Sequence, residues 1–495
     1  MIHVKEVETR RLYTLIDRMS AGARRRKSPL DVLMSAAAPI ASQTACPIHL
    51  LRTWSRPGAR FPTYPGVEQF SANFGYRDFL QTVAGLRTRG SHNVLALSLY
   101  LPGFDITSER SSPHRHSAEP EPSAVYLGYL KRECEMQGQL FAGMNRIEQL
   151  SLRGSGTALL SNAQITSLMQ HLRHCFQFAP DSIGVYTVEV DVAHLTAQRL
   201  DVLRRAGFNH VRLPFLDIAP MQAGPPDGWH MQRHALAGID QLRAASFRSM
   251  HVDLLMGCVQ QNLMMLSRAL KVMIDARIDR IVLHDMASLI DSECKARSMV
   301  DALGTDLDAS ANLAQCMWQL DQAGYINIGM DHFVRPGDPL AVAQAQGRLH
   351  ANLDGFSARA DYDLIACGVG AISAIGAVYT QNVATLETYY DQIDGNALPI
   401  RAGIALGMDD VLRRAVMQML MCNLLLSVRS IELAYPITFA DYFAPELVAL
   451  DKLALDGLLT LDSEWLSITA KGRRQIRSIC QVFDRALSER RLAVA

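Results

Sequence analysis

Seven short runs of apolar or β-branched residues alternate with segments of helical character along the middle of this 495-residue chain. The runs span residues 94–100, 147–152, 185–190, 210–215, 250–256, 280–284 and 326–330. A strand that alternates repeatedly with a helix is typical of a parallel sheet or barrel, and near-continuous apolar strands fit burial on both faces. We therefore predict an α/β fold built on a partial (β/α) TIM-like barrel, in preference to a doubly wound sheet.

The helix that follows the third run has recognisable ends. Thr196 has the side chain of a helix N-cap, and Gly207 is a typical terminator. Leu200 and Leu203 lie between them at the spacing of one helix face. The sequence thus predicts a helix that begins after Thr196 and ends before Gly207.

The pattern changes after residue 373. Residues 411–428 and 446–456 have the pattern of apolar helices, residues 457–469 alternate like a hairpin that turns at 462–464, and residues 471–490 have the pattern of a last helix. This order indicates a small helical or winged-helix-like C-terminal domain.

The changes in pattern divide the chain into four segments. We expect a poorly ordered, Arg-containing N-terminal extension at residues 1–55 and a segment at 56–93 that packs on the barrel. The barrel itself is expected at 94–375 and the C-terminal helical domain at 376–495. A chain of this length is ample to bury a core in each of the two large parts.

Composition excludes several classes of protein. Lys plus Arg and Asp plus Glu each total 49, so the chain has no overall field that would attract nucleic acid. It contains no run of 18 apolar residues, so no membrane-spanning helix is expected. The nine cysteines include no CxxC pair, and residues 1–27 lack the apolar core of a secretion signal. We expect a cytoplasmic protein with scattered free thiols.

Several motifs in the second half of the chain match a known family. They are Gly-Met-Asp-His-Phe at 329–333, Gly-Val-Gly-Ala-Ile-Ser at 368–373, Phe-Ala-Asp-Tyr-Phe at 439–443 and Thr-Ala-Lys-Gly-Arg at 469–473. With these motifs the chain resembles the oxygen-independent coproporphyrinogen III oxidase family, the radical SAM dehydrogenases of haem and porphyrin biosynthesis. The similarity covers roughly residues 56–490, and it implies a barrel of the radical SAM type.

The family carries a CxxxCxxC loop after the first barrel strand, and this chain departs from it. In the family the three thiolates hold a [4Fe-4S] cluster that binds S-adenosyl-L-methionine, whose cleavage starts the chemistry. The corresponding positions here are Ile106, Arg110 and Pro113, and no Cys occurs between Cys46 and Cys134. We therefore predict that the chain binds no metal and no cluster, and its catalytic residues, if it has any, are unknown.

The resemblance also marks positions that surround the nucleoside of S-adenosyl-L-methionine. They are Tyr100, Gly156, Thr157, Glu189, Asp253 and Ile372. Leu216 and Gly228 stand where the family has Gln and Arg, so polar contacts are lost together with the cluster. For Glu189 and Asp253, a structural hydrogen bond is the alternative to a binding role.

His332 and Arg335 are the candidates for binding substrate, because they lie in the motif that is most similar to the family. An Arg makes charge-assisted, bidentate hydrogen bonds to carboxylates, such as the propionates of a tetrapyrrole. Packing of the loop is the alternative for both residues.

Three functions remain open. The leading one is a paralogue without a cluster that binds a tetrapyrrole, such as coproporphyrinogen III or a haem-like molecule, or acts in haem metabolism without radical chemistry. The second is a coproporphyrinogen III dehydrogenase that stays active through other iron ligands, although outer hydrogen bonds do not replace lost ligands. The third is a non-catalytic partner of an intact paralogue.

Overall fold

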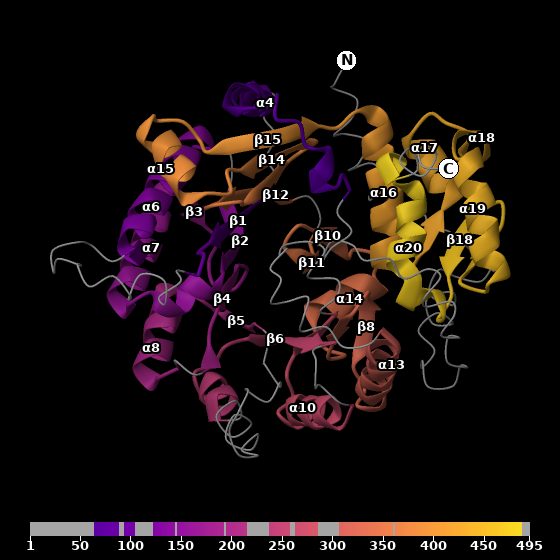
Figure 1. Cartoon of the computed structure of the whole chain (residues 1–495), viewed down its shortest axis with the longest axis horizontal. Helices are drawn as coiled ribbons and strands as arrows, with labels where there is room; N and C mark the ends of the chain where they lie inside the picture. Colours follow the sequence, from indigo (N-terminus) through magenta and orange to yellow (C-terminus); the bar gives the residue numbers. More distant parts are fainter. Residues whose placement is uncertain are drawn as a thin grey trace.

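The largest element of the fold is a sheet of 13 strands. The computed structural model describes residues 64–88, 94–103, 122–143, 146–192, 195–214, 237–257, 263–285, 306–359 and 362–487. The sheet curves into an arc, and the last part of the chain forms a separate group of helices on the open side of the arc (Figure 1). The predicted extension at residues 1–55 lies outside the described residues.

Seven parallel strands form the middle of the sheet. In spatial order they are β12 (Tyr362–Cys367), β1 (Val94–Tyr100), β2 (Arg146–Arg153), β4 (Val185–Glu189), β5 (His210–Leu213), β6 (Ser249–Met256) and β7 (Arg280–Asp285). The short β3 (Gln177–Phe178) pairs with β2. Each of the first six apolar runs of the sequence forms one of these strands, which confirms the predicted α/β barrel.

The seventh run forms a strand with a different orientation. β8 (Ile326–Gly329) pairs antiparallel with β9 (His332–Val334), and β9 pairs antiparallel with β7. A parallel neighbour needs a long crossover, whereas the tight turn at Met330, which has a φ of 49°, leads directly into an antiparallel strand. This antiparallel pair ends the sheet beside β7.

Antiparallel strands also end the sheet on its other side. They are β13 (Ile372–Ile375), β14 (Val378–Asn382) and β15 (Ile400–Ala405), with helix α15 (Leu386–Asp394) between the last two. The sheet therefore continues past residue 375, where the sequence predicts the end of the barrel. The N-terminal η2 (Val67–Gln69) and α4 (Tyr76–Thr88) flank Ser71, which pairs with Gly403 of β15.

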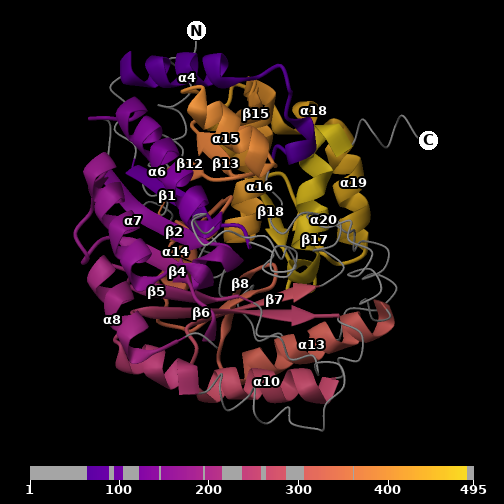
Figure 2. The same ribbon diagram turned by 60° about the vertical axis from the view of Figure 1, so that its left-hand side comes forward.

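Helices cover the convex side of the sheet (Figures 1 and 2). They are α6 (Pro122–Leu140), α7 (Asn162–Cys175), α8 (Ala197–Ala206), α10 (Leu263–Asp275) and α13 (Asp306–Gln322). The Thr196 side chain accepts a hydrogen bond from the backbone N–H of Arg199, and Gly207 ends α8 with a φ of 105°, as the sequence predicts. No helix within the described ranges is long and apolar enough to cross a membrane.

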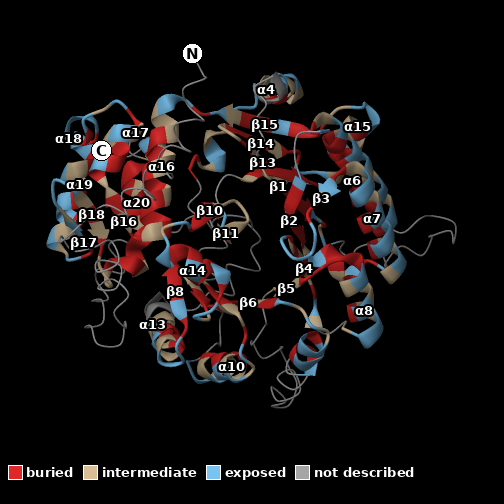
Figure 3. Ribbon diagram, turned by 180° about the vertical axis from the view of Figure 1, so that it is seen from behind, coloured by how far each residue is buried: buried red, intermediate tan, exposed pale blue. Residues whose placement is uncertain are grey.

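The apolar core lies between the sheet and these helices (Figure 3). Leu97 and Leu99 of β1 are fully buried there, together with Leu130 of α6 and Leu168 of α7. Side chains alternate between the two faces of a strand, so Ser98 points to the concave side instead. Apolar residues thus hold the helices, and polar residues are left on the concave face.

A small hairpin lies on the concave side of the arc (Figures 1 and 3). It consists of β10 (His350–Asn352) and β11 (Gly355–Ser357), and it follows the short helix α14 (Pro339–Ala345). Asp354 in its turn accepts hydrogen bonds from Arg153 Nη1 of β2, at 2.9 Å, and from Ser98 Oγ of β1, at 3.3 Å. These polar contacts fix the hairpin against the inside of the barrel.

The C-terminal part has its own core and its own sheet. Its helices are α16 (Met408–Asn423), α17 (Val428–Ala434), α18 (Phe439–Tyr442) and α19 (Ala444–Leu455). The predicted hairpin forms as β17 (Leu459–Leu461) and β18 (Trp465–Ile468), and β16 (Leu425–Ser427) joins it. The predicted helix at 411–428 therefore ends earlier, because Leu424 adopts a φ of 58° and the chain turns into β16.

The last predicted helix, at residues 471–490, is divided into short turns. They are η5 (Gly472–Gln475), α20 (Ile476–Cys480) and η6 (Gln481–Phe483). Ile476, Ile479, Cys480 and Phe483 are all buried in the core of this part. Packing on several sides overrides the helical pattern of the sequence.

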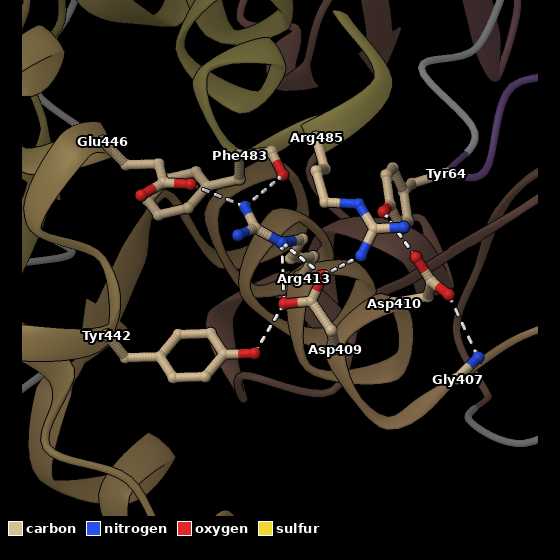
Figure 4. A network of polar contacts seen from close by, with 9 residues as sticks. All are labelled: Tyr64, Gly407, Asp409, Asp410, Arg413, Tyr442, Glu446, Phe483 and Arg485. Carbon is tan, nitrogen blue, oxygen red and sulfur yellow. Dashed lines mark hydrogen bonds and ion pairs between the residues drawn. The ribbon is translucent and has the colours of Figure 1, made fainter. Parts of the chain in front are cut away.

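A polar network joins the elements of the C-terminal part (Figure 4). Arg413 of α16 contacts Asp409 at 2.9 Å, Glu446 of α19 at 2.7 Å and the carbonyl of Phe483 at 3.1 Å. Tyr442 and Arg485 also contact Asp409, and we call Asp409, Arg413, Tyr442, Glu446 and Arg485 the C-terminal network. It connects helices that are distant in sequence.

The N-terminal segment reaches the same region. The Tyr64 hydroxyl donates a hydrogen bond of 2.8 Å to Asp410, whose other oxygen accepts from the backbone N–H of Gly407 (Figure 4). Burial, together with the hydrogen bond to Asp410, raises the pKa of Tyr64 well above its usual range. Tyr64 therefore stays a neutral donor that ties the beginning of the described chain to α16.

Candidate functional site

Several of the residues selected from the sequence gather where the parallel strands end. Tyr100 is the last residue of β1 and Glu189 is the last residue of β4. Ile372 begins β13 directly after the turn that follows β12. Carboxyl ends of parallel strands meet at one edge of a barrel, which is where barrels of this kind carry their sites. The structure thus brings these three residues to the same end.

The glycine-rich turn after β2 lies at this end as well. A Cβ atom on Gly154, which has a φ of 99°, would lie 2.1 Å from the carbonyl oxygen of Leu101. A Cβ atom on Gly156 would lie 2.3 Å from the carbonyl oxygen of Pro102. The glycines are therefore required by the close approach of two backbone segments, whether or not a ligand binds.

Thr157 connects this turn to the next strand. Its hydroxyl donates a hydrogen bond of 2.9 Å to the backbone carbonyl of Glu189. Arg199 of α8 in turn donates to the carbonyl of Thr157 at 3.0 Å. The structure thus brings Gly156, Thr157 and Glu189 together.

Tyr100 is a residue that is 43% exposed but has a backbone held by hydrogen bonds. Its carbonyl accepts a hydrogen bond of 2.7 Å from the Tyr126 hydroxyl. The same hydroxyl accepts from the backbone N–H of Val369 at 3.1 Å. Tyr126 of α6 thereby couples the end of β1 to the turn after β12.

Glu133 is a buried carboxyl group behind that turn. It accepts hydrogen bonds from Tyr389 Oη at 2.6 Å, from Asn382 Nδ2 at 2.7 Å and from the backbone N–H of Gly368 at 2.8 Å. Burial raises the pKa of Glu133 to about 7, although these hydrogen bonds oppose the rise. Sequence reasoning missed Glu133, because a single Glu in a helix gives no sign that it is buried.

Asp253 lies at the centre of a polar cluster on the concave face. Its Oδ2 accepts a hydrogen bond of 2.6 Å from Arg212 Nε, and its Oδ1 lies 3.0 Å from His284 Nε2 and 3.2 Å from His251 Nε2. Burial opposes ionisation of Asp253, but Arg212 and the two imidazoles hold the pKa of its carboxyl well below the usual range. Asp253 is therefore a charged group whose two oxygens are both engaged within the protein.

Arg212 is the cation of this cluster, and the sequence did not single it out. It pairs in register with Glu189 of β4 and with His251 of β6. Burial by itself would lower the pKa of Arg212, but the charges of Asp253, Glu189 and Asp354 raise it overall. A lone Arg in an apolar run was the available signal, and the register of the strands was needed to interpret it.

His332 joins the same cluster from β9. Its ring meets the Phe356 ring edge to face, with centroids 5.1 Å apart. Burial lowers the pKa of His332 well below its usual range and lowers that of His251 to about 4. Both imidazoles are therefore neutral near pH 7. We call Arg212, His251, Asp253, His284 and His332 the barrel cluster.

Arg335 lies at the opposite end of the barrel from the carboxyl ends of the parallel strands. Its neighbour Val334 pairs with Arg280, the first residue of β7, because β9 runs antiparallel to β7. The Arg335 backbone N–H donates to the carbonyl of Asp279 at 3.0 Å, and its side chain is 42% exposed. The structure thus brings His332 to Asp253 and does not bring Arg335 to either residue.

The residues present do not match the cluster that the resemblance implies. Ile106, Arg110 and Pro113 lie outside the described residues, but none of these side chains can serve as a thiolate ligand. Among the described residues, no group of three His, Cys, Asp or Glu is placed to hold a metal ion. The free cysteines in this part of the chain are packed into the core, and burial raises the pKa of both Cys316 and Cys480 to about 12.

The fold and the position of the site define the class of protein. A curved, mostly parallel sheet with helices outside it and residues gathered at its carboxyl ends is matched by a solved structure from Escherichia coli, titled coproporphyrinogen III oxidase, a radical SAM enzyme. The TM-score is 0.77 at 31% sequence identity, and the match covers 90% of this chain and 100% of that one. The chain therefore has the radical SAM fold.

Sequence comparisons give the family. The model of the HemN C-terminal domain matches residues 408–474. The oxygen-independent coproporphyrinogen III oxidase of Escherichia coli is 35% identical over 448 residues, which cover 89% of this chain and 95% of the relative. The oxidase of that name from Pseudomonas aeruginosa is 32% identical over 440 residues, which cover 88% and 95%. The chain belongs to the oxygen-independent coproporphyrinogen III oxidase family.

Proposed function

We propose that this chain binds a tetrapyrrole of the coproporphyrinogen III class and acts in haem metabolism, in the cytoplasm, without radical chemistry. Its relatives are named for coproporphyrinogen III, and the match covers 95% of the Escherichia coli relative. The observation that carries the proposal is the lack of any Cys between Cys46 and Cys134 in a chain that otherwise spans its relatives. A cluster held by three thiolates does not form on Ile, Arg and Pro.

Tetrapyrroles of this class carry several carboxylates, so a binding surface needs cations at the open end of the barrel. Arg153 is the last residue of β2, opposite Tyr100, and it contacts Asp354 at 2.9 Å. A guanidinium has five N–H donors, so one bound carboxylate leaves others available to a ligand. We therefore assign Arg153 as one anchor for a propionate.

Arg477 is the second anchor that we propose. It belongs to α20 of the C-terminal part and contacts Asp331 at 3.0 Å in the turn between β8 and β9. The carbonyl of Asp331 accepts from the backbone N–H of Leu283, near the carboxyl end of β7. Arg477 thus reaches the same end of the barrel as Arg153, from the other side of the arc.

The test is a fluorescence-quenching titration of the full chain with coproporphyrin III, the stable oxidised form. We expect micromolar affinity in the wild type and about a tenfold loss in Arg153→Ala and in Arg477→Ala, because a charge-assisted hydrogen bond contributes roughly 1.5 to 3 kcal/mol. Arg335→Ala is the matched control at the opposite end of the barrel, and its affinity should equal that of the wild type.

Three outcomes would contradict the proposal. Absence of saturable binding below about 100 μM would exclude a tetrapyrrole as the ligand and would favour a non-catalytic partner of an intact paralogue. Equal affinity in all four proteins would show that the carboxylates do not meet these arginines. Turnover of coproporphyrinogen III with S-adenosyl-L-methionine would instead support a dehydrogenase that uses other iron ligands.

A further inference from the structure

The barrel cluster occupies the place where the resemblance predicts a nucleoside. Glu189 and Asp253 are the two carboxylates expected to contact that ligand, and a carboxylate binds a nucleoside by accepting hydrogen bonds from it. Asp253 already accepts from Arg212 and lies within hydrogen-bond distance of His284. Its side chain is 2% exposed. Asp253 therefore has no accessible oxygen to offer to a ligand.

Arg212 lies between the strands that carry the two carboxylates and contacts one of them directly. It lies beside Glu189 in the register of β4 and β5, and its Nε is 2.6 Å from Asp253 of β6. The guanidinium is planar and carries several donors, so it resembles a polar ligand in its demands on neighbouring oxygens. Its side chain is 13% exposed.

We propose that Arg212 is a built-in cation that takes the position of a nucleoside between Glu189 and Asp253 and thereby excludes nucleoside ligands from the barrel. A nucleoside that bound Asp253 would have to displace the guanidinium and leave it buried without its partner, which is strongly unfavourable. The inference deepens the proposed function, since it gives a second, independent reason why the chain does not use S-adenosyl-L-methionine.

The test measures binding of S-adenosylhomocysteine to the full chain by isothermal titration calorimetry. The wild type should show no saturable binding below about 100 μM. Arg212→Ser removes the guanidinium and should strengthen binding at least tenfold, into a range that the calorimeter resolves. The matched control is Arg280→Ser, which removes another buried pair, Arg280 with Asp338 at 2.8 Å, and should leave binding as weak as in the wild type.

Loss of Arg212 leaves the buried charge of Asp253 without its cation, which could unfold the protein. A second variant keeps the test decisive in that case. Arg212→Gln keeps a donor for Asp253 and is smaller than Arg, and it should also gain affinity. Thermal melts show which variants are folded. Micromolar binding by the wild type would overturn the inference, as would a folded Arg212 variant without any gain. Neither result depends on the porphyrin titration, so failure of the proposed function and failure of this inference are distinguishable.

Discussion

Two buried arginines in this chain look alike and are placed very differently. Arg212 in the barrel cluster lies 2.6 Å from Asp253, and Arg413 in the C-terminal network lies 2.7 Å from Glu446. The partners of Arg212 come from adjacent strands that backbone hydrogen bonds already join. Arg413 also pairs with Asp409 of its own helix, but its other partners come from α19 and from near the end of the described chain.

This contrast separates two uses of a buried ion pair. Where an ion pair joins elements that share no backbone hydrogen bonds, it helps to hold those elements together. Its loss should therefore lower the stability of the fold. Where a pair lies across one sheet, at the end where ligands bind, the strands do not need it to stay together. The barrel cluster is therefore the better place to test the proposed function, and the C-terminal network is the better place to test the stability of the fold.

The largest effect is expected for Arg413→Ala. The change leaves Glu446 buried without its cation, and breaking a buried pair in this way costs about 3 to 5 kcal/mol. Chemical denaturation followed by circular dichroism measures it. The matched control is Arg485→Ala, which removes a half-exposed contact to the same Asp409 and should cost less than about 1 kcal/mol. Equal losses in both variants would contradict a structural role centred on Arg413.

Gly154→Ala should destabilise the barrel by up to about 3 kcal/mol, the upper part of the range for strained backbone. Its φ of 99° and the carbonyl of Leu101 leave no room for a Cβ atom. Gly128→Ala in α6 is the control, because a Cβ atom there meets nothing within 4 Å and Ala favours a helix. If Gly154→Ala were as stable as the wild type, the turn after β2 would have to be more adaptable than its geometry indicates.

The pH dependence of stability tests the neutral imidazoles of the barrel cluster. The pKa of His251 is lowered to about 4, so the stability that its neutral form contributes is complete above pH 6.5 and is lost as the pH falls toward 4. Between pH 7 and pH 5 the wild type should lose about 2 kcal/mol more than His251→Gln does.

Glu133 acts in the opposite direction in the same interval. Its pKa is raised to about 7, so its contribution is complete below pH 4.3 and is lost as the pH rises toward 7. This contribution is common to both proteins and cancels in their difference. Parallel stability curves for the wild type and His251→Gln would show that His251 is not held neutral by burial.

The strands that could be predicted from the sequence are those whose residues form a short, nearly continuous apolar run. The runs that became β1, β2 and β4 to β7 supply the apolar residues that pack under the outer helices, and local propensity and burial agree there. The sequence did not predict β14 and β15, because polar residues such as Gln381 alternate with apolar ones near the edge of the sheet. The prediction of one regular helix at the C-terminal end was wrong, because residues buried on several sides divide this segment into short turns.

The site was harder to predict for a geometrical reason. Tyr100, Gly156, Thr157 and Glu189 lie at strand ends, so their order in the chain places them at one edge. The barrel cluster depends on register between four strands, which no single stretch of sequence encodes. Arg335 follows His332 by three residues, yet an extended strand of that length spans about 10 Å and carries it toward the other end.

Anaerobic reconstitution with iron and sulfide tests the central claim, that this family member has kept the barrel without the radical chemistry. The full chain is reconstituted beside the Escherichia coli relative, and iron, sulfide and the absorption spectrum are measured for both. We expect iron and sulfide at background in this chain and no absorption band near 400 nm. Roughly four irons per chain with such a band would contradict the claim and show that the chain holds the cluster of a radical SAM enzyme.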